Sequence, residues 1–378
     1  MNSLLVLVAS ALAITGLEVG LRWVAWYRGS EDPTATGDQY AFYRYDSTLG
    51  WRNVPNARGT FRRSEFAFPL RINALGLRGA DTPRAKPSGV RRVAFLGDSF
   101  TWGIGAADSE LASSLIARRI PGVEVLNFGV SGYGPIQYLL QTDEVLAFQP
   151  DLIVIVFCLG NDFIDNVLWQ RYGYYKPFAR FDTVGALVID GTPPPNIRDL
   201  VETTPAWLTA ARRSEMARVT RRAIERVRGP APPPTAAYGQ RGLVQLADDG
   251  SDLYRTPHDS VVELAIRINT RLFERIAARY QAAGIPLVVV AAPTKCEFGD
   301  CFADLPAPSD AARRALARSL EGLPLTLIDP TPAFLLSDFW VRDRHWRPSG
   351  HQKLADALLV PIAHILASPT RAPRATTP

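Results

Sequence analysis

The sequence predicts an α/β fold, a three-layer α/β/α sandwich around a mostly parallel sheet of five strands. Short apolar segments alternate with longer segments of helical periodicity, which is typical of a parallel sheet covered by helices on both faces. The segment from Leu152 to Leu159 is apolar throughout, as expected of a strand buried on both faces. The chain has 378 residues, of which 47% are hydrophobic, so it can bury a sizeable core.

The expected strands and helices follow one another in alternation. The strands are expected at residues 92–96, 123–128, 152–159, 286–292 and 325–328. The helices are expected at about residues 110–120, 135–148, 260–283, 308–320 and 349–367. We expect a strand order like that of flavodoxin, in which ligands bind beyond the carboxyl ends of the strands, where the order reverses.

An apolar segment, Leu4–Tyr27, stands at the N-terminus. About 20 apolar residues suffice to cross a bilayer as a helix, although Glu18 and Arg22 interrupt this segment at a cost of a few kcal/mol. We therefore expect a membrane anchor or signal segment within residues 1–28. A buried amphipathic helix and a signal peptide cleaved near Ala11-Leu12-Ala13 remain the alternatives.

The rest of the chain divides into three further parts. Residues 38–90 form an N-terminal extension, and residues 91–367 form the α/β domain. An interval at about 163–257 breaks the alternation, and because intervals of this length are usually functional or structured we interpret it as an inserted cap. Residues 368–378 are rich in Pro, Thr and Arg and are expected to be disordered.

Three cysteines bear on the compartment of the protein. Cys158 lies in an apolar strand and is expected to be a small core residue. Cys296 and Cys301 flank a short loop, and this spacing suits either a local disulfide, which would imply an oxidising compartment, or two reduced thiols. Zinc is disfavoured because no second pair of ligands has matching spacing. We expect a membrane-anchored protein whose body lies outside the cytoplasm, in a bacterial periplasm or at a cell surface, although Arg22 and Arg28 weakly favour the opposite orientation.

A candidate site residue follows each of the first three predicted strands. Ser99 follows the first strand within Gly-Asp-Ser, and its hydroxyl needs an adjacent base to act as a nucleophile. Gly132 follows the second strand in a glycine-rich turn that can point backbone N–H groups at a ligand. Asn161 follows the third strand, where an amide N–H can stabilise an oxyanion. Each feature alone is also ordinary turn chemistry.

The candidate base is one of only four histidines. Asp343 precedes His345 by two residues, so its carboxylate can orient the imidazole and stabilise its charged form. His258 precedes a predicted helix and is expected to be structural, and His351 lies in the first turn of the last helix. No metal and no cofactor are expected, because a set of ligands for one is missing from the sequence.

With these residues in this order, the chain resembles the SGNH, or GDSL-type, hydrolase superfamily. The four sequence blocks of that family match Gly97-Asp98-Ser99, Gly132, Gly160-Asn161-Asp162 and Asp343 with His345. The resemblance implies that Ser99 is the nucleophile, His345 its base and Asp343 the acid that orients the base. It also implies an oxyanion hole formed by the N–H groups of Ser99 and Gly132 and by the Asn161 side chain.

Two details qualify this resemblance. Many members of the family place the acid three residues before the histidine, and Arg342 occupies that position here. Asp343, which lies two residues before His345, therefore departs from the family pattern. The segment Asn73–Gly79 resembles the lead-in of membrane-anchored bacterial members.

The expected function is that of a serine esterase, which hydrolyses a carboxylic O-acyl ester, an acetyl ester being one candidate, through an acyl-enzyme. The expected partners are an ester substrate, such as an acylated glycan or lipid, and a membrane. Two alternatives stay open: an O-acyltransferase that acts on a cell-envelope polysaccharide with the same three residues, and a non-catalytic binding or assembly protein of the same fold. Nucleic acid is not expected, because the basic run 212–228 lacks a recognisable binding module.

Overall fold

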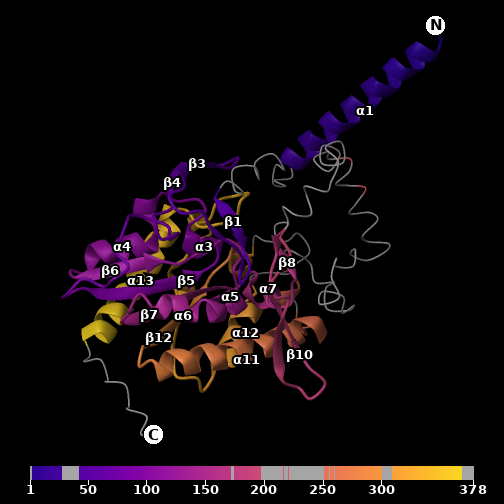
Figure 1. The fold of residues 1–378 in the computed structure, drawn as a ribbon. Coiled ribbons are helices and arrows are strands. Elements are labelled where there is room, and N and C mark those ends of the chain that lie inside the picture. The colour runs from indigo at the N-terminus through magenta and orange to yellow at the C-terminus, as the bar shows by residue number, and fades with distance from the viewer. Residues whose placement is uncertain are drawn as a thin grey trace.

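The computed structural model describes residues 2–27, 42–171, 174–196, 251–254, 256–258, 260–299 and 309–367, together with Met216 and Thr220. The first helix, α1 (Asn2–Tyr27), projects from an α/β body that contains all the sheets (Figure 1). The Pro-rich run at 229–234 and the tail at 368–378 lie outside the described residues.

The central sheet has five strands, which run in the order β13-β12-β7-β5-β6. Each neighbouring pair is parallel, so the sheet is parallel throughout. Read from the β6 edge, the strands are the second, first, third, fourth and fifth along the chain, which is the flavodoxin-like order predicted from the sequence. The direction in which successive strands are added reverses between β5 and β7. The strands are β5 (Arg91–Gly97), β6 (Val123–Asn127), β7 (Leu152–Cys158), β12 (Leu287–Ala292) and β13 (Thr326–Ile328).

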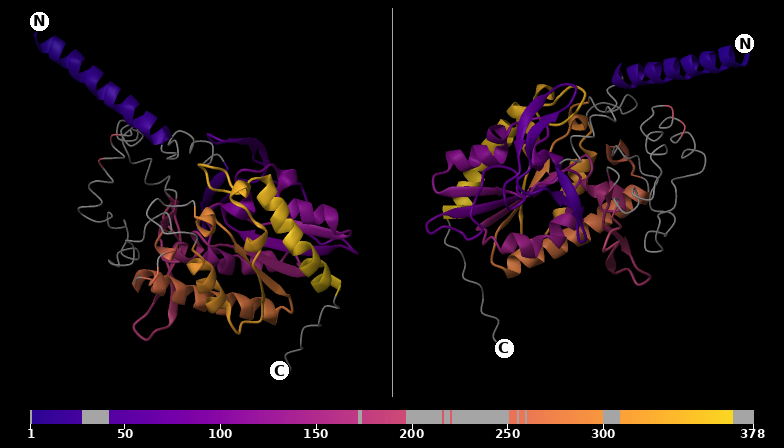
Figure 2. Two further views of the ribbon diagram at one scale, coloured as in Figure 1. Left: turned by 180° about the vertical axis from the view of Figure 1, so that it is seen from behind. Right: turned by 45° about the horizontal axis from the view of Figure 1, so that its top comes forward.

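Helices cover both faces of this sheet, so the body has the predicted three layers (Figure 2). One face packs under α4 (Ala112–Arg119) and α13 (Pro348–Ala367), the yellow helix of the figure. The opposite face packs against four helices: α5 (Pro135–Leu140), α6 (Thr142–Leu146), α11 (Ser260–Ala282) and α12 (Ala311–Leu320).

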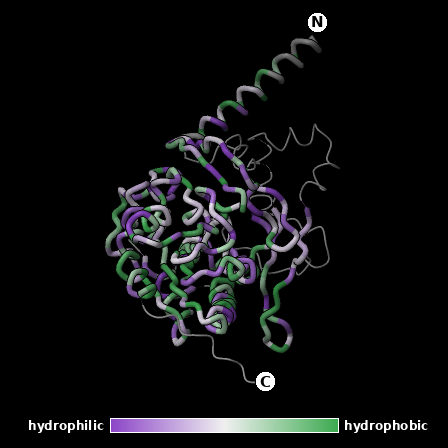
Figure 3. The backbone as a smooth tube through the Cα atoms, turned by 60° about the vertical axis from the view of Figure 1, so that its left-hand side comes forward, coloured by the Kyte–Doolittle hydropathy of each residue, from purple (hydrophilic) through white to green (hydrophobic). Residues whose placement is uncertain are grey.

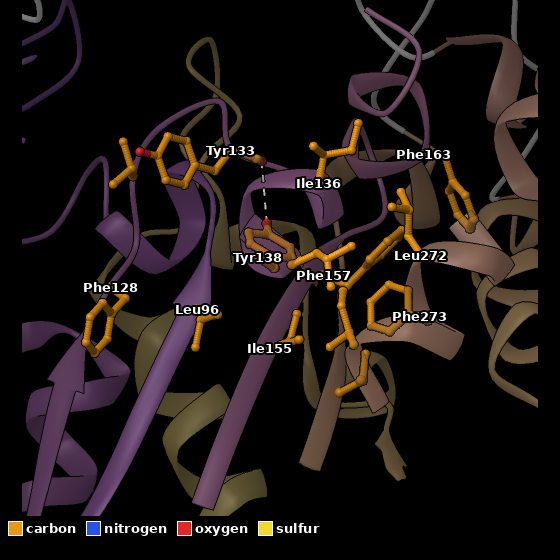
Figure 4. Close-up of a cluster of buried hydrophobic side chains, with 14 of the residues drawn as sticks. Leu96, Phe128, Tyr133, Ile136, Tyr138, Ile155, Phe157, Phe163, Leu272 and Phe273 are labelled. Carbon is orange, nitrogen blue, oxygen red and sulfur yellow. Dashed lines mark hydrogen bonds between the residues drawn. The ribbon is translucent and has the colours of Figure 1, made fainter. Parts of the chain in front are cut away.

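Alternate strand residues supply the two cores, because successive side chains of a strand point to opposite faces. Ile155 and Phe157 of β7 point toward α11, where Phe157 packs against Phe273 at a ring distance of 5.9 Å (Figure 4). Phe163, just beyond β7, meets the edge of Phe157 at 4.9 Å. Burial of each such side chain stabilises the fold by about 1.5–3 kcal/mol. The apolar strands therefore lie inside the body (Figure 3), and the end of β7 is fixed by packing.

The prediction of one continuous helix at 135–148 is wrong in one respect. The structure has two helices there, α5 and α6, which are separated at Gln141. The hydroxyl of Thr142 donates to the carbonyl oxygens of Leu139 at 2.7 Å and Tyr138 at 3.2 Å. A Thr side chain that bonds back to the preceding turn competes with the backbone and bends a helix. This local competition is too weak to be visible in the hydrophobic pattern.

The N-terminal extension forms two antiparallel hairpins that are part of the core. The first joins β1 (Tyr43–Asp46) to β2 (Gly50–Asn53), and the second joins β3 (Arg58–Arg62) to β4 (Ala67–Arg71). Both pack on Trp102, whose indole N–H donates to Asn53 at 3.0 Å. The hairpins thereby lie against the segment that directly follows Ser99.

The described part of the predicted insertion contributes short elements around the end of β7. They are α7 (Asp162–Asp165), the pair β8 (Gln170–Arg171) and β9 (Tyr174–Tyr175), the pair β10 (Phe178–Phe181) and β11 (Leu187–Asp190), and the 3-10 turn η3 (Ser251–Tyr254). Lys176, which joins β9 to β10, is fully buried and donates to the carbonyl oxygen of Asp165 at 2.6 Å. The insertion is therefore anchored to the strand end that carries Asn161.

Short helical turns complete the described structure. They are α3 (Ser99–Trp102) and the 3-10 turns η1 (Asp108–Glu110), η4 (Lys295–Phe298), η5 (Thr331–Ala333) and η6 (Leu336–Asp338). Most of them lie at the carboxyl edge of the sheet, where they connect a strand to the following helix.

The described helices include none that is both long enough and apolar enough to span a membrane. The prediction of a membrane helix within residues 1–28 is therefore not supported. Within α1, Glu18 and Arg22 lie one turn apart and form an ion pair at 2.9 Å, and such charges are costly in a bilayer.

Candidate active site

Ser99 lies directly beyond β5 and begins the short helix α3. The carboxylate of Asp98 caps this helix by accepting from the backbone N–H of Phe100 at 2.9 Å, and it also accepts from the Ser99 hydroxyl at 3.3 Å. Gly97 has no room for a side chain, since an added Cβ would lie 2.0 Å from the hydroxyl of Thr101. Each residue of Gly-Asp-Ser thus has a local role, and together they hold the Ser99 hydroxyl in a tight turn.

The histidine predicted as the base lies beside this hydroxyl. Nε2 of His345 is 2.8 Å from Oγ of Ser99, and Nδ1 of His345 is 2.5 Å from Oδ1 of Asp343. The loop that carries both residues connects η6 to α13, and the ring of Phe100 packs on the imidazole at 5.0 Å. The structure therefore brings Ser99, His345 and Asp343 together in one hydrogen-bonded row.

Burial and charge act in opposite directions on the two ionisable members of this row. Burial lowers the pKa of His345, but the charge and hydrogen bond of Asp343, with a smaller contribution from Asp98, outweigh it and raise this pKa overall. Burial raises the pKa of Asp343, but the imidazole and the guanidinium of Arg63 outweigh it and lower this pKa. The site consequently favours a charged imidazole next to an ionised carboxylate, the state that forms when His345 accepts a proton.

The two residues predicted for the oxyanion hole follow the strands on either side of β5. Gly132 follows β6 with φ of +78°, a conformation that favours glycine. Asn161 follows β7, and its side-chain amide donates to Oδ2 of Asp165 at 2.6 Å. The same nitrogen lies 3.5 Å from Oδ1 of Asp162, so two carboxylates set the orientation of the amide plane.

A buried carboxylate supports the turn that carries Asn161. Asp162 accepts from the backbone N–H of Cys158 and from the hydroxyl of Tyr138, each at 3.1 Å. Burial, together with the nearby charges of Asp98 and Asp165, raises the pKa of Asp162 well above its ordinary value. These two hydrogen bonds hold Asp162 against the backbone of the turn that carries Asn161.

A second buried group reaches the same turn from the insertion. Burial lowers the pKa of Lys176 to about 8. Its ammonium lies 3.9 Å from Oδ1 of Asp165, and Nε of Arg171 lies 3.5 Å from the same oxygen. The two cations hold Asp165, which in turn holds the amide of Asn161. Sequence analysis did not select these residues, because only the fold brings the insertion to the end of β7.

Of the cysteines, Cys158 is a free thiol buried at the end of β7, where burial raises its pKa well above the ordinary value. Cys296 is disulfide-bonded, and its predicted partner Cys301 lies outside the described residues. Within the described ranges no group of three or more His, Cys, Asp or Glu side chains is arranged to hold a metal ion.

A cavity of about 290 Å³ lies near the end of β6, and neither Ser99 nor His345 lines it. Its charged lining includes Arg52, which pairs at 2.5 Å with Glu144 and also with Asp46. The charge of Arg52 is therefore offset within the cavity, which is separate from the serine site.

Residues 95–256 match the family of GDSL-like lipases and acylhydrolases. This segment of the chain is therefore similar to GDSL-like lipases and acylhydrolases. The matched residues include Ser99, Gly132 and Asn161 but end before Asp343 and His345, which the fold alone brings to the serine. This match supports the assignment of the chain as a carboxylic ester hydrolase.

Comparison with solved structures also finds proteins of similar description at low identity. A lipase/acylhydrolase from Enterococcus faecalis is 12% identical, with 75% of this chain and 100% of that chain covered and a TM-score of 0.39. A GDSL-like lipase from Bacteroides thetaiotaomicron VPI-5482 is 13% identical, with 74% and 89% covered and a TM-score of 0.36. No curated protein sequence matches the chain. Likenesses this distant carry no conclusion about substrate.

Proposed function

We propose that this protein hydrolyses an O-acyl ester through a covalent acyl-enzyme on Ser99. The observation that carries the proposal is the 2.8 Å contact between Oγ of Ser99 and Nε2 of His345, whose other ring nitrogen contacts Asp343. A serine hydroxyl is a weak nucleophile until an adjacent base can take its proton, and this arrangement provides the base and orients it.

In the proposed mechanism, His345 accepts the hydroxyl proton as Oγ of Ser99 attacks the ester carbonyl. The negative charge that develops on the carbonyl oxygen is stabilised by the backbone N–H groups of Ser99 and Gly132 and by the side-chain amide of Asn161. His345 then donates its proton to the leaving alcohol. Water, activated by the same imidazole, hydrolyses the acyl-enzyme and regenerates the serine.

The substrate class that we propose is an acylated glycan or lipid with a short acyl group. The supporting observation is the insertion, which adds two small antiparallel sheets and the buried Lys176 next to the end of β7. Additional elements at the carboxyl edge of a parallel sheet are where such folds build their substrate contacts. The acyl group and the alcohol are the finer features that need a direct assay.

The test is hydrolysis of p-nitrophenyl acetate, butyrate and octanoate by the purified protein, together with labelling by a fluorophosphonate. We expect the acetate to be hydrolysed fastest and one label per chain on the Ser99 peptide. Labelling without hydrolysis, combined with acyl transfer to a glycan seen by mass spectrometry, would replace hydrolysis by transfer. A wild-type protein that neither hydrolyses nor takes the label would contradict catalysis at Ser99.

We also propose that the catalytic body works in an oxidising compartment, outside the cytoplasm. The disulfide bond of Cys296 supports this location, because disulfides persist mainly in such compartments. Mass spectrometry of unreduced peptides from freshly isolated protein tests it. A Cys296 that is fully alkylated without prior reduction would argue against the proposed location.

A further inference from the structure

The turn of the hairpin β3–β4 reaches the loop that carries the catalytic acid and base. Residues 63–66 form this turn, which is closed by a backbone hydrogen bond from Arg63 to Phe66 at 2.9 Å. We call residues 340–345 the acid-bearing loop. The turn and this loop are separated by almost 280 positions in the chain. Their contact is therefore a tertiary feature, and it involves residues that precede the 95–256 segment matched to the family.

Glu65 binds the backbone of the acid-bearing loop with one carboxylate. It accepts from the N–H groups of Val341 at 3.0 Å, Arg342 at 2.6 Å and Asp343 at 2.7 Å. Three consecutive backbone N–H groups can point at one carboxylate only when the backbone turns around it. The Glu65 carboxylate therefore fixes the conformation of the loop backbone at these residues. Hydrogen bonds to an ionised acceptor are roughly twice as strong as neutral ones.

Arg63 acts on the side chain of the same residue that Glu65 holds by its backbone. Nε of Arg63 is 3.8 Å from Oδ2 of Asp343, and the two side chains are only 6% and 5% exposed. Oδ1 of Asp343 faces His345, so the two carboxylate oxygens have different partners. This division favours one rotation of the carboxylate over the others.

Other contacts hold the loop at its first residues. The ring of Phe66 packs on Trp340 at 5.0 Å, and the backbone N–H of Trp340 donates to the carbonyl oxygen of His345 at 2.9 Å. The ammonium of Lys295 also donates to the carbonyl oxygen of Val341 at 2.9 Å. The hairpin turn thus forms one wall of a clamp on the acid-bearing loop.

The contacts of the clamp surround a residue with an unfavourable backbone conformation. Asp343 and His345 are separated only by Arg344, which has φ of +72°. A residue other than glycine in this region costs on the order of 1–3 kcal/mol and persists only when its surroundings enforce it. Without external contacts, we expect the loop to relax and the Asp343 carboxylate to leave Nδ1 of His345.

We propose that Glu65 and Arg63 are positioning residues for the hydrolytic reaction, which hold the Asp343 carboxylate in line with His345. This inference rests on the proposed function. The N-terminal extension would then contribute to catalysis, because the turn of its second hairpin contacts both the backbone and the side chain of Asp343.

The test compares Glu65→Gln and Arg63→Met with a matched control, Thr60→Ala, which changes an exposed residue of the same hairpin. The readouts are the pH profile of kcat/KM for p-nitrophenyl acetate and the Tm. We expect Glu65→Gln to lower kcat/KM by about tenfold to 10²-fold, because misplacing a catalytic group by about 1 Å can cost that much. Thr60→Ala should match the wild type in both readouts.

The pH profile separates positioning from general weakening, because general weakening would lower kcat/KM without moving the acid limb. Asp343 and Asp98 favour protonation of His345 and Arg63 opposes it, whereas Glu65 and Lys295 bond to the backbone of the loop. Glu65→Gln weakens the contact of Asp343 with His345, so its acid limb should move to lower pH. Arg63→Met removes a charge that disfavours protonation of His345 but also loosens the Asp343 carboxylate, so its acid limb should move less than that of Glu65→Gln while kcat still falls.

A double variant isolates the route through Asp343. In the Asp343→Asn background, Glu65→Gln should change kcat/KM by less than about twofold, because interacting residues are not additive. Equal losses in both backgrounds, or unshifted acid limbs in both single variants, would overturn the inference. If Ser99→Ala is inactive while Glu65→Gln matches the wild type, only the positioning role fails; if Ser99→Ala stays active, the proposed function fails with it. Arg63→Met keeps the three backbone bonds and serves if Glu65→Gln does not fold.

Discussion

Ser99→Ala is expected to reduce kcat by about 10⁶-fold, the size of the loss on removal of a triad serine in other enzymes. The hydroxyl of Ser99 contacts His345 and Asp98, and no other group replaces it as a nucleophile in this row. The cap of α3 is formed by Asp98 and the N–H of Phe100, so the variant should retain the wild-type fold. The measurements are kcat with p-nitrophenyl acetate, fluorophosphonate labelling and the Tm.

A graded control accompanies this variant. Asn161→Ala should lower kcat by about 10²- to 10³-fold, the usual effect of losing one oxyanion donor, and should keep the fluorophosphonate label. It also releases Asp165 from its 2.6 Å contact, so a small fall in Tm is expected. Unchanged ester hydrolysis by Ser99→Ala would refute the acyl-enzyme, and a wild-type kcat for Asn161→Ala would remove Asn161 from the oxyanion hole.

The central sheet could be predicted because its residues carry a strong and local signal. The run that became β7 is apolar at every position, and burial on both faces is the only arrangement that hides all of its side chains. The same reasoning located the candidate site. Ser99, Gly132 and Asn161 follow strands that are neighbours in the sheet, and the carboxyl ends of parallel strands meet at one edge.

The contacts that surround this site could not be predicted, because they depend on pairs that are distant in the chain. Glu65 is an unremarkable acidic residue in a hairpin turn, and its partners are backbone N–H groups, which have no sequence signature. Lysine is usually found at the surface, but Lys176 is buried beside Asp165. Its ammonium and the guanidinium of Arg171 both lie near the same carboxylate oxygen. Such pairs are set by the fold rather than by periodicity.

The N-terminal helix shows a different limit, because here the sequence predicted a helix and also an environment for it, and the structure supports only the helix. The apolar composition of Leu4–Tyr27 predicted a membrane span, and the segment does form one helix, α1. Hydrophobicity favours burial of some kind but does not specify a bilayer, and Glu18 and Arg22 form an ion pair within that helix. Composition alone could not weigh these charges against the apolar residues around them.

Asp343→Asn is the second change for which we expect a large effect, a loss of about 10⁴-fold in kcat, as for the same change in other triads. The carboxylate of Asp343 accepts from Nδ1 of His345 and so leaves Nε2 without a proton, ready to accept from Ser99. An asparagine amide can donate to Nδ1 instead. It would then favour the tautomer that carries its proton on Nε2, which cannot serve as the base.

The pH profile gives this variant its own signature, because the acid limb of kcat/KM reports the pKa of His345 in the free enzyme. In the wild type this pKa is raised despite burial, since Asp343 outweighs the desolvation of the imidazole. Asp343→Asn removes the negative charge that raises the pKa of His345. Burial of the imidazole then lowers this pKa, so the acid limb should move to lower pH. An assay from pH 4 to pH 9 measures the shift, with the Tm as the control for folding. A variant whose kcat stays within about threefold of the wild type, with an unmoved acid limb, would mean that another group orients His345.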